Sequence, residues 1–255
     1  MVDVAKQEDP RGIPLNEVGI THLQLPITLE DKTQGTQHTI GIFDAYVALP
    51  GNQKGTHMSR IVEAVYNNRQ KVNQYGLIDA ATEMRDKLDA EYGEISVSFS
   101  YYVSRKSPAS GLDNIMVYQA EFTAGSDGTF FIGVDVDVQS VCPCAKEECG
   151  NGNSHVQRGL VSIKVKPVLG QWIWLEDLIE IAERAGSSPV LARLKRPDEK
   201  ALVLSAFQNA KFCEDITRDA VVQLKGRTDI EWFEVSTTNY ESIHAHNCKS
   251  TYRSC

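Results

Sequence analysis

The first half of the chain changes its hydrophobic period from two residues to between three and four, and then back to two. Met58, Ile61 and Val65 share one face of a helical pattern, whereas the flanking segments alternate and are rich in β-branched and aromatic residues. Gly93 follows the second helical segment and is expected to be its C-terminal cap. The pattern predicts helices at 57–66 and 78–92 and strands at 18–29, 39–49, 95–101 and 115–122.

After the turn at 125–128 the same order of elements begins again. The pattern predicts strands at 129–141, 155–168, 230–237 and 243–252, helices at 172–184 and 211–225, and a short helical stretch capped by Asp198. Because strands linked by hairpins form antiparallel sheets, each half is expected to be a ββααββ unit whose helix pair covers one face of its sheet. The sequence therefore predicts an α+β fold with a flexible lead-in at 1–14, a first unit at 15–126 and a second unit at 127–255.

Composition limits the classes of protein and of partner. The chain has 255 residues, of which 42% are hydrophobic and 24% charged, as in ordinary soluble globular proteins. No stretch approaches the roughly 18 consecutive apolar residues of a membrane span, and residues 1–10 lack the apolar segment of a secretory signal. The formal charge of −8 argues against broad nucleic-acid binding. We expect a cytoplasmic protein with neither a membrane nor a nucleic acid as partner.

Thiol and imidazole groups gather in one segment of the second half. Three of the six cysteines lie between positions 142 and 149, and His155 stands eleven residues after Cys144. If the chain is extended here, Cys142 and Cys144 point the same way, and the Gly/Asn-rich turn at 150–153 is able to fold His155 back onto them. Thiolate and imidazole are the usual ligands of zinc-like ions. The pattern favours metal binding or catalysis over disulfides, and the alternative is ordinary thiols with an unrelated histidine.

Three further segments carry groups suited to binding or catalysis. Segment 54–60 contains lysine, histidine and arginine where a strand meets a helix N-terminus, and these are the parts of a phosphate site without P-loop spacing. In segment 241–246, His244 and His246 are two residues apart on an expected strand, so they would share a face. The ordinary interpretation of these segments, and of the charged run at 194–200, is a solvated surface.

Five segments in one order carry a resemblance to a known family. Over roughly residues 12–250 the chain resembles GTP cyclohydrolase IB, the prokaryotic enzyme family of the first step of folate biosynthesis. The segments that carry the resemblance are 54–60, 95–99, 142–147, 194–200 and 241–246. The resemblance implies a tunnelling fold (T-fold) and a homotetramer with active sites between subunits. It also implies hydrolytic opening of the imidazole ring of GTP, which releases formate and gives 7,8-dihydroneopterin triphosphate.

The resemblance implies roles for individual residues as well. The residues that match the metal ligands of the family are Cys142, His155 and Glu199. Such a donor set suits zinc, manganese or iron, and three protein ligands leave the open position of a catalytic site. Glu214 matches the carboxylate that anchors guanine. The residues that match positions at or near the active site, with catalytic roles expected, are Cys142, Cys144, Glu241, His244 and His246. The cations expected to hold the triphosphate are Lys54, His57 and Arg60, followed by Lys195 and Arg196.

Other interpretations remain open from the sequence. Cys142, Cys144, Cys149 and His155 are able to close a four-coordinate zinc site in a cytosolic interaction module, which would unfold on chelation. The nitrile reductase of the queuosine pathway is another T-fold enzyme, but its Glu-Ser-Lys-Ser signature is absent here. The archaeal relative of the cyclohydrolase forms a cyclic phosphate product, and the mass of the product distinguishes the two.

Overall fold

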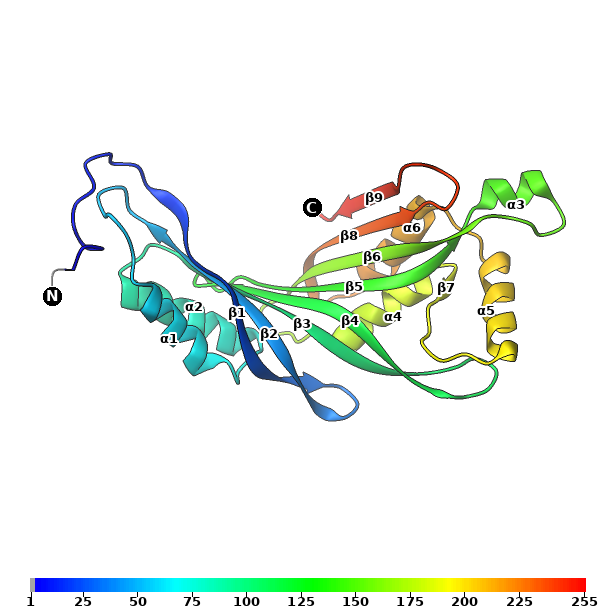
Figure 1. Ribbon diagram of the computed structural model, residues 1–255, viewed down its shortest axis with the longest axis horizontal. Coiled ribbons are helices and arrows are strands. Elements are labelled where there is room, and N and C mark those ends of the chain that lie inside the picture. The colour runs from blue at the N-terminus through cyan, green and yellow to red at the C-terminus, as the bar shows by residue number, and fades with distance from the viewer. Residues whose placement is uncertain (1–2) are drawn as a thin grey trace. The chain divides into compact units, whose positions relative to one another are not determined.

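The structure is a computed structural model that describes residues 3–255 (Figure 1). The elements of the first half are β1 (Leu15–Asp31), β2 (Gly35–Leu49), α1 (Met58–Asn68), α2 (Gln74–Leu88), β3 (Gly93–Lys106) and β4 (Asp113–Gly125). Those of the second half are β5 (Phe130–Val141), α3 (Pro143–Cys149), β6 (Val156–Pro167), α4 (Leu175–Ala185), β7 (Ser188–Pro189), α5 (Arg196–Gln208), α6 (Cys213–Lys225), β8 (Ile230–Tyr240) and β9 (Cys248–Arg253). Each predicted element is present with shifted ends, and α3 and β7 are additional.

The strands pair in the antiparallel manner that the hairpin-like spacing predicted. The order in the sheet is β1-β2-β3-β4-β5-β6-β8-β9, and β7 pairs with β5. The pairs β1–β2, β2–β3, β5–β6, β6–β8 and β8–β9 are antiparallel. Along the chain, α1 and α2 lie between β2 and β3, and α4 and α6 lie between β6 and β8. The predicted α+β order ββααββ is therefore confirmed in both halves.

Strand β2 illustrates how alternation produces a half-buried strand. Phe43, Ala45 and Val47 are each at most 1% exposed, while the residues between them face the other side of the sheet. Phe43 pairs with Val97 and Ala45 with Ile95 across the β2–β3 ladder. Register is specified because a slip by one residue would move this apolar set to the opposite face.

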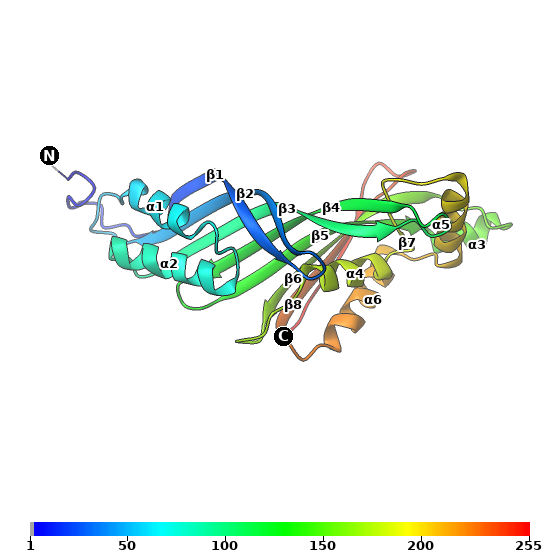
Figure 2. The same ribbon diagram turned by 90° about the horizontal axis from the view of Figure 1, so that it is seen from below.

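Helices α1 and α2 lie side by side over one face of the first strands (Figure 2). Helix α2 begins earlier than predicted because the Asn73 side chain accepts a hydrogen bond from Gly76 N at 3.0 Å, as an N-cap does. The helix ends at Leu88 because Asp89 adopts a left-handed conformation with φ of 53°. The predicted capping role of Gly93 is therefore wrong. Gly93 instead begins β3, where a Cβ atom would lie 2.8 Å from the carbonyl oxygen of Ala81.

Contacts within the chain divide it into two compact units. The units are Met1–Ser100 with Glu121–Phe131, and Tyr101–Ala120 with Ile132–Cys255. Segment 101–120, which was expected in the first unit, thus groups with the second. The reason is visible in its hydrogen bonds to α4, where Tyr101 Oη donates to Glu176 Oε1 at 2.9 Å and Arg105 Nε to Glu183 Oε2 at 2.9 Å. A boundary at 126 separates the two repeats of the element order, but it does not separate the two units that the contacts define.

In the second unit, α4 and α6 pack on one face of β6 and β8 (Figure 2). Ile163 of β6, Leu178 of α4 and Ile216 of α6 are each at most 1% exposed. The four-residue step from Ile216 through Ala220 to Leu224 is the apolar stripe that predicted α6. The core of this unit is therefore built from elements that also carry the residues of the candidate site.

The lead-in expected at 1–14 runs beside the segment that follows β2. Lys54 N donates to Gln7 O at 3.0 Å, and Gly55 N donates to Ala5 O at 3.1 Å. Residues 1 and 2 lie outside the described residues. These backbone hydrogen bonds fix residues 54 and 55, which precede α1 and belong to the predicted phosphate-binding segment 54–60.

Asp198 anchors the start of α5 to the β3–β4 hairpin. Its carboxylate accepts from Ser110 Oγ at 2.7 Å, from the Ser110 and Ala109 amides at 2.7 and 2.9 Å, and from Lys195 N at 2.8 Å. Burial alone would raise the pKa of this carboxyl, but the hydrogen bonds from Ser110, Lys195 and Ala109 hold it well below its usual range. Asp198 is the third helical residue, so it caps α5 from inside the first turn.

Asp198→Asn is expected to lower the melting temperature by several degrees, because one amide NH₂ would face donors that now bond to a carboxylate oxygen. The matched control is Glu199→Gln, the same chemical change at the next residue, which is exposed. It should leave the thermal transition of the metal-free protein nearly unchanged. Differential scanning calorimetry of both variants checks this, and equal transitions for Asp198→Asn and the parent chain would contradict the anchoring role.

Candidate active site

The second unit contains a pocket of about 200 Å³. The residues predicted for the active site that line it are Cys142, His155, Glu214, Glu241, His244 and His246. The lining residues that the sequence did not single out are Gln157, Lys211, Phe212, Cys213, Asn239 and Cys248. Residues separated by up to 106 positions (142 to 248) thus meet around one cavity.

Cys142 and His155 are brought together by the pairing of β5 with β6. Val141 pairs with Val156 at the end of this ladder, and the Cys142 amide donates to the His155 carbonyl oxygen at 3.3 Å. Cys142 is half-buried, and its sulfur accepts from Ala145 N at 3.5 Å as the N-cap of α3. The strand register therefore places a thiol beside an imidazole.

Cys144 does not share this pocket. The prediction that Cys142 and Cys144 face the same way assumed an extended chain, and that is wrong because α3 begins at Pro143. Successive side chains of a helix turn by about 100°, so residues two apart point in different directions. Cys144 is exposed and is not among the residues that line the pocket.

The ring of His155 is held by polar neighbours. Its Nδ1 lies 2.8 Å from Gln157 Oε1, 3.5 Å from Ser242 Oγ and 3.9 Å from Glu241 Oε2. Gln157 Oε1 is the nearest of these and the only one at an ordinary hydrogen-bond length. The other ring nitrogen, Nε2, is the atom left for a metal ion or a substrate.

His244 and His246 reach the pocket from a loop. They were predicted on a strand, but β9 begins only at Cys248, so that prediction is wrong. Their rings nevertheless stack, with centroids 5.2 Å apart and planes at 16°, and His244 lies 6.2 Å from the ring of His155. Both are exposed, which suits groups that exchange protons with a bound substrate.

Glu214 stands in the first turn of α6, at the mouth of the pocket. It is exposed, and the neighbouring Cys213 thiol donates to its Oε2 at 3.2 Å. Burial and the Glu214 carboxylate raise the pKa of Cys213 to about 12. Phe212, 40% exposed, adds a flat apolar side chain beside the carboxylate. An anionic acceptor next to an aromatic ring suits a planar ligand with N–H groups.

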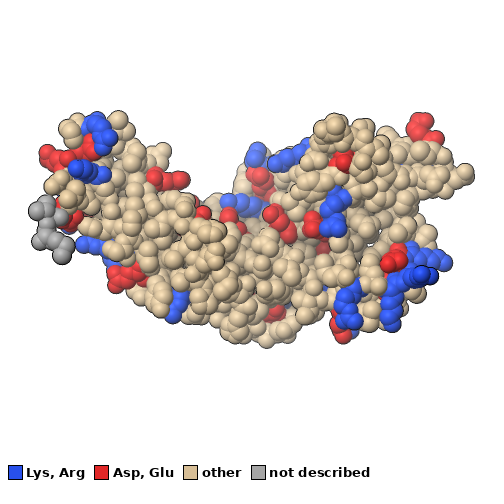
Figure 3. Space-filling view, in the orientation of Figure 1, with Lys and Arg blue, Asp and Glu red and all other residues tan. Residues whose placement is uncertain are grey.

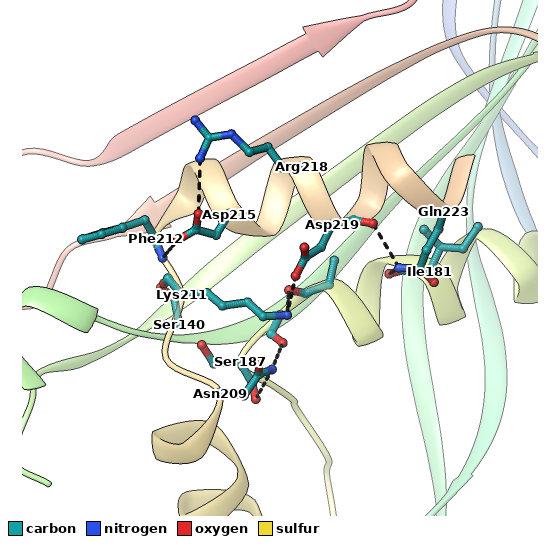
Figure 4. A network of polar contacts seen from close by, with 12 residues as sticks. Ser140, Ile181, Ser187, Asn209, Lys211, Phe212, Asp215, Arg218, Asp219 and Gln223 are labelled. Carbon is teal, nitrogen blue, oxygen red and sulfur yellow. Dashed lines mark hydrogen bonds and ion pairs between the residues drawn. The ribbon is translucent and has the colours of Figure 1, made fainter. Parts of the chain in front are cut away.

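A network of polar contacts fixes the start of α6 against β5 (Figure 4). Lys211 Nζ donates to Ala185 O at 2.9 Å and pairs with Asp219 Oδ2 at 2.7 Å. The Lys211 amide donates to Val141 O at 3.0 Å. In the next residue, Phe212 N donates to the Asp215 carboxylate at 3.1 Å, which caps the helix. These bonds hold the start of α6 beside the end of β5, so Glu214 and Cys142 line the same pocket.

The predicted residues at the start of α5 also lie outside this pocket. Glu199, Lys195 and Arg196 are exposed at the start of α5 and are not among its lining residues. Figure 3 shows Lys and Arg side chains gathered at the end of the second unit where α5 lies. Within residues 3–255, no group of three or more Cys, His, Asp or Glu is arranged to hold a metal ion. Glu199 as a third metal ligand therefore stays a prediction.

The first unit has a polar pocket of about 300 Å³ that includes His57 and Arg60. Lys6 and Lys87 add two more cationic side chains to its lining, and Glu8 and Asp89 add two carboxylates. Lys54 is exposed nearby in sequence and does not line it. His57 Nε2 lies 3.1 Å from Asp3 Oδ2, and Arg60 Nη1 donates to Lys87 O at 3.0 Å. We refer to this cavity as the basic pocket.

The environment of Cys213 predicts resistance to alkylation. At pH 8, iodoacetamide should label the exposed Cys144, Cys149 and Cys255 first and Cys213 only after denaturation, because the buried thiol keeps its proton. The pKa of Cys213 in the folded protein is about 12, above the ordinary 9.0 of the unfolded chain. Below about pH 9 the thiol is protonated in both states and does not change the free energy of unfolding. Between pH 9 and pH 12 only the unfolded chain loses the proton, so the stability of the folded protein falls as the pH rises.

Peptide mass spectrometry checks the order of labelling. Urea unfolding between pH 9 and pH 11 checks the linkage. Relative to Cys213→Ala, the unfolding equilibrium constant of the parent chain should rise by up to about tenfold per pH unit. Rapid labelling of Cys213 in the folded protein would show that the thiol is neither buried nor held protonated.

The fold and the pocket together define a T-fold protein with thiol, imidazole and carboxylate groups around one cavity. The uricase from Arthrobacter globiformis has the same fold, with a TM-score of 0.55 over 94% of this chain and 93% of that one at 8% identity. The chain belongs to the family described as type I GTP cyclohydrolase folE2, whose model matches residues 1–250. The predicted T-fold and the predicted family are thereby confirmed.

Relatives of the same family are similar in sequence to this protein over nearly its whole length. GTP cyclohydrolase FolE2 of Geotalea uraniireducens is 41% identical over 249 residues, which cover 97% of this chain and 91% of the relative. The protein of the same name in Thermosipho africanus is 38% identical over 250 residues, covering 97% and 95%. The family converts GTP to 7,8-dihydroneopterin triphosphate with release of formate, in folate biosynthesis. No helix in the described part of the chain has the length and apolarity to span a membrane.

Proposed function

We propose that the pocket around Cys142, His155 and Glu214 is where this chain opens the imidazole ring of GTP. The observation that carries the proposal is the convergence of two strand ends and one helix start on a single cavity. It brings a soft metal-ligand pair and a carboxylate acceptor within one ligand-sized region. The zinc-module interpretation needed Cys144 and Cys149 at the same point, and both are exposed on α3.

The donor set of the pocket fits a divalent metal ion. Cys142 offers a sulfur, and His155 offers Nε2 because its Nδ1 is engaged by Gln157. Glu199 is the proposed third ligand, carried by α5. Zinc, manganese and iron all suit a mixed thiolate, imidazole and carboxylate set. When bound, such an ion would act as a Lewis acid that lowers the pKa of water from about 15.7 towards about 7.

The remaining groups of the pocket have roles in holding substrate and moving protons. Opening the ring at C8 leaves a ring nitrogen that must gain a proton, and His244 or His246 is the proposed donor. Glu241 lies 3.9 Å from His155 Nδ1 and so adds negative charge beside the imidazoles. Cys144, exposed on α3, is proposed to lie beside the reaction rather than on the ion.

Recognition of guanine is assigned to Glu214. Guanine presents N1–H and its 2-amino group side by side, and a carboxylate is able to accept from both. The position of Glu214 in the first turn of α6 also favours an anionic side chain electrostatically. The neighbouring ring of Phe212 offers a surface for the purine.

The triphosphate is assigned to cationic groups outside this pocket. The basic pocket, with His57 and Arg60, is the first candidate, together with the exposed Lys54. Lys195 and Arg196 are the second candidates, since they lie exposed at the start of α5. We propose a cytoplasmic homotetramer in which neighbouring subunits together complete each site.

The test is incubation of purified protein with GTP and zinc, manganese or iron. Formate and a fluorescent pterin should appear together, with the mass of the open triphosphate and not of a cyclic phosphate. Sedimentation at assay concentration measures the assembly. Failure to release formate with any of the three metals would overturn the assignment of the pocket, and fully active monomers would overturn the tetramer.

A further inference from the structure

A chain of buried polar side chains joins two residues that line the pocket to Ser140, which does not line it, and the sequence assigned this chain no role. Ser140 of β5, Gln157 of β6 and Asn239 of β8 are 0%, 7% and 2% exposed. Ser140 and Gln157 are directly paired in the β5–β6 ladder. Buried polar side chains are costly unless hydrogen-bonded, so the direction of each bond is constrained by its neighbours.

The constraint begins at the carbonyl oxygen of Lys211, which only accepts hydrogen bonds. Ser140 Oγ lies 3.1 Å from it and must therefore donate its single proton there (Figure 4). Ser140 Oγ then has only acceptor capacity left. It accepts a hydrogen bond from Asn239 Nδ2 at 2.8 Å, and Gln157 Nε2 makes a longer contact of 3.5 Å with the same oxygen.

The orientation of the Gln157 amide follows from this. Because its NH₂ group faces Ser140, its Oε1 faces His155, where it lies 2.8 Å from Nδ1. Oε1 is an acceptor only, so the proton of a neutral imidazole must be on Nδ1. In the reverse amide orientation Gln157 Oε1 would face the Ser140 oxygen, whose single proton is already donated to Lys211 O, so two acceptors would face each other.

We propose that Ser140 and Gln157 are positioning residues that hold His155 as the Nδ1–H tautomer, so that the lone pair of Nε2 is available to a ligated metal ion. The tautomer itself follows from the chain of hydrogen bonds, while its consequence for metal binding rests on the function proposed above. Residues that orient a ligating histidine typically contribute 10- to 100-fold to metal affinity. Gln157 thus favours a neutral His155 that ligates a metal ion through Nε2. It does not favour a His155 that acts as a general base through Nδ1.

The test uses full-length metal-free protein with ¹⁵N-labelled histidine, at a pH where imidazole is neutral. The parent chain should show a pyrrole-like Nδ1 and a pyridine-like Nε2 at His155. Gln157→Leu should shift the signals towards the opposite tautomer, because it removes the acceptor nearest to Nδ1 and leaves only Ser242 Oγ at 3.5 Å and Glu241 Oε2 at 3.9 Å. Its affinity for zinc, measured by competition with a chromogenic chelator, should fall about 10- to 100-fold.

Two further variants separate positioning from structure. Gln139→Leu makes the same change on the neighbouring strand, where the side chain bonds to Ser188, and should leave tautomer and zinc affinity unchanged. Gln157→Glu keeps an acceptor facing Nδ1 and should restore the Nδ1–H tautomer. A pyridine-like Nδ1 in the parent chain would overturn the proposal even if Gln157→Leu does not fold. So would a Gln157→Leu chain with unchanged tautomer and affinity. A parent chain with the expected tautomer but no zinc binding would instead overturn the metal site.

Discussion

Cys142→Ala is expected to lose bound metal and to release formate no faster than the metal-free parent protein, while remaining folded. Sulfur is the softest donor of the pocket, and its loss leaves His155 without the partner that the strand pairing places beside it. The fold should survive because Cys142 is only half-buried, whereas the cores of both units are made of fully buried apolar side chains. Metal analysis, formate release and circular dichroism together measure this.

The matched control is Cys144→Ala, the same substitution two residues later. Cys144 is exposed on α3 and does not line the pocket, so this variant should keep measurable metal. If Cys144→Ala empties the site and Cys142→Ala does not, the roles of the two thiols are reversed. If both variants keep full metal and full activity, neither thiol holds the ion.

Glu214→Gln is expected to weaken GTP binding by roughly ten- to a hundredfold. The amide replaces one carboxylate oxygen by a donor that faces the N–H groups of guanine, and each buried donor left unpaired costs about 1–3 kcal/mol. Affinity for an ATP analogue, held by its phosphates, should change much less. Titration calorimetry with both nucleotides measures the difference.

Glu147→Gln is the control for this change, since Glu147 is exposed on α3 and does not line the pocket. It should bind GTP as the parent chain does. The Cys213 thiol should stay buried in Glu214→Gln. An unchanged melting temperature would then show that weaker GTP binding does not come from unfolding. Unchanged GTP affinity of Glu214→Gln would remove guanine recognition from this residue.

Some residues of the site were readable from the sequence, and others were not. Gln157 follows His155 by two positions at the start of β6, and a period of two was the signal that could have placed both on one face. Pro143 at the first position of α3 was a signal for a helix where an extended segment was expected. Ser140 and Asn239 carried no such signal, because they meet through strand register.

The sequence by itself determined the order of elements and the chemistry available. Alternation, helical stripes and turn residues are local properties, and a strand such as β2 buries its apolar face whatever its partners are. The family motifs likewise brought the thiol, imidazole and carboxylate groups with them. Alternation and helical stripes depend on near neighbours in the chain, which is why the order of the elements was predicted correctly.

Only the tertiary structure decided which of these groups meet. Cys142 lies beside His155 because β5 pairs with β6, and Glu214 joins them because Lys211 ties the start of α6 to Val141 and Ala185. Cys144 points away from Cys142 because α3 begins at Pro143, between the two cysteines. Juxtaposition depends on register and packing between residues far apart in the chain, and neither is contained in a local period.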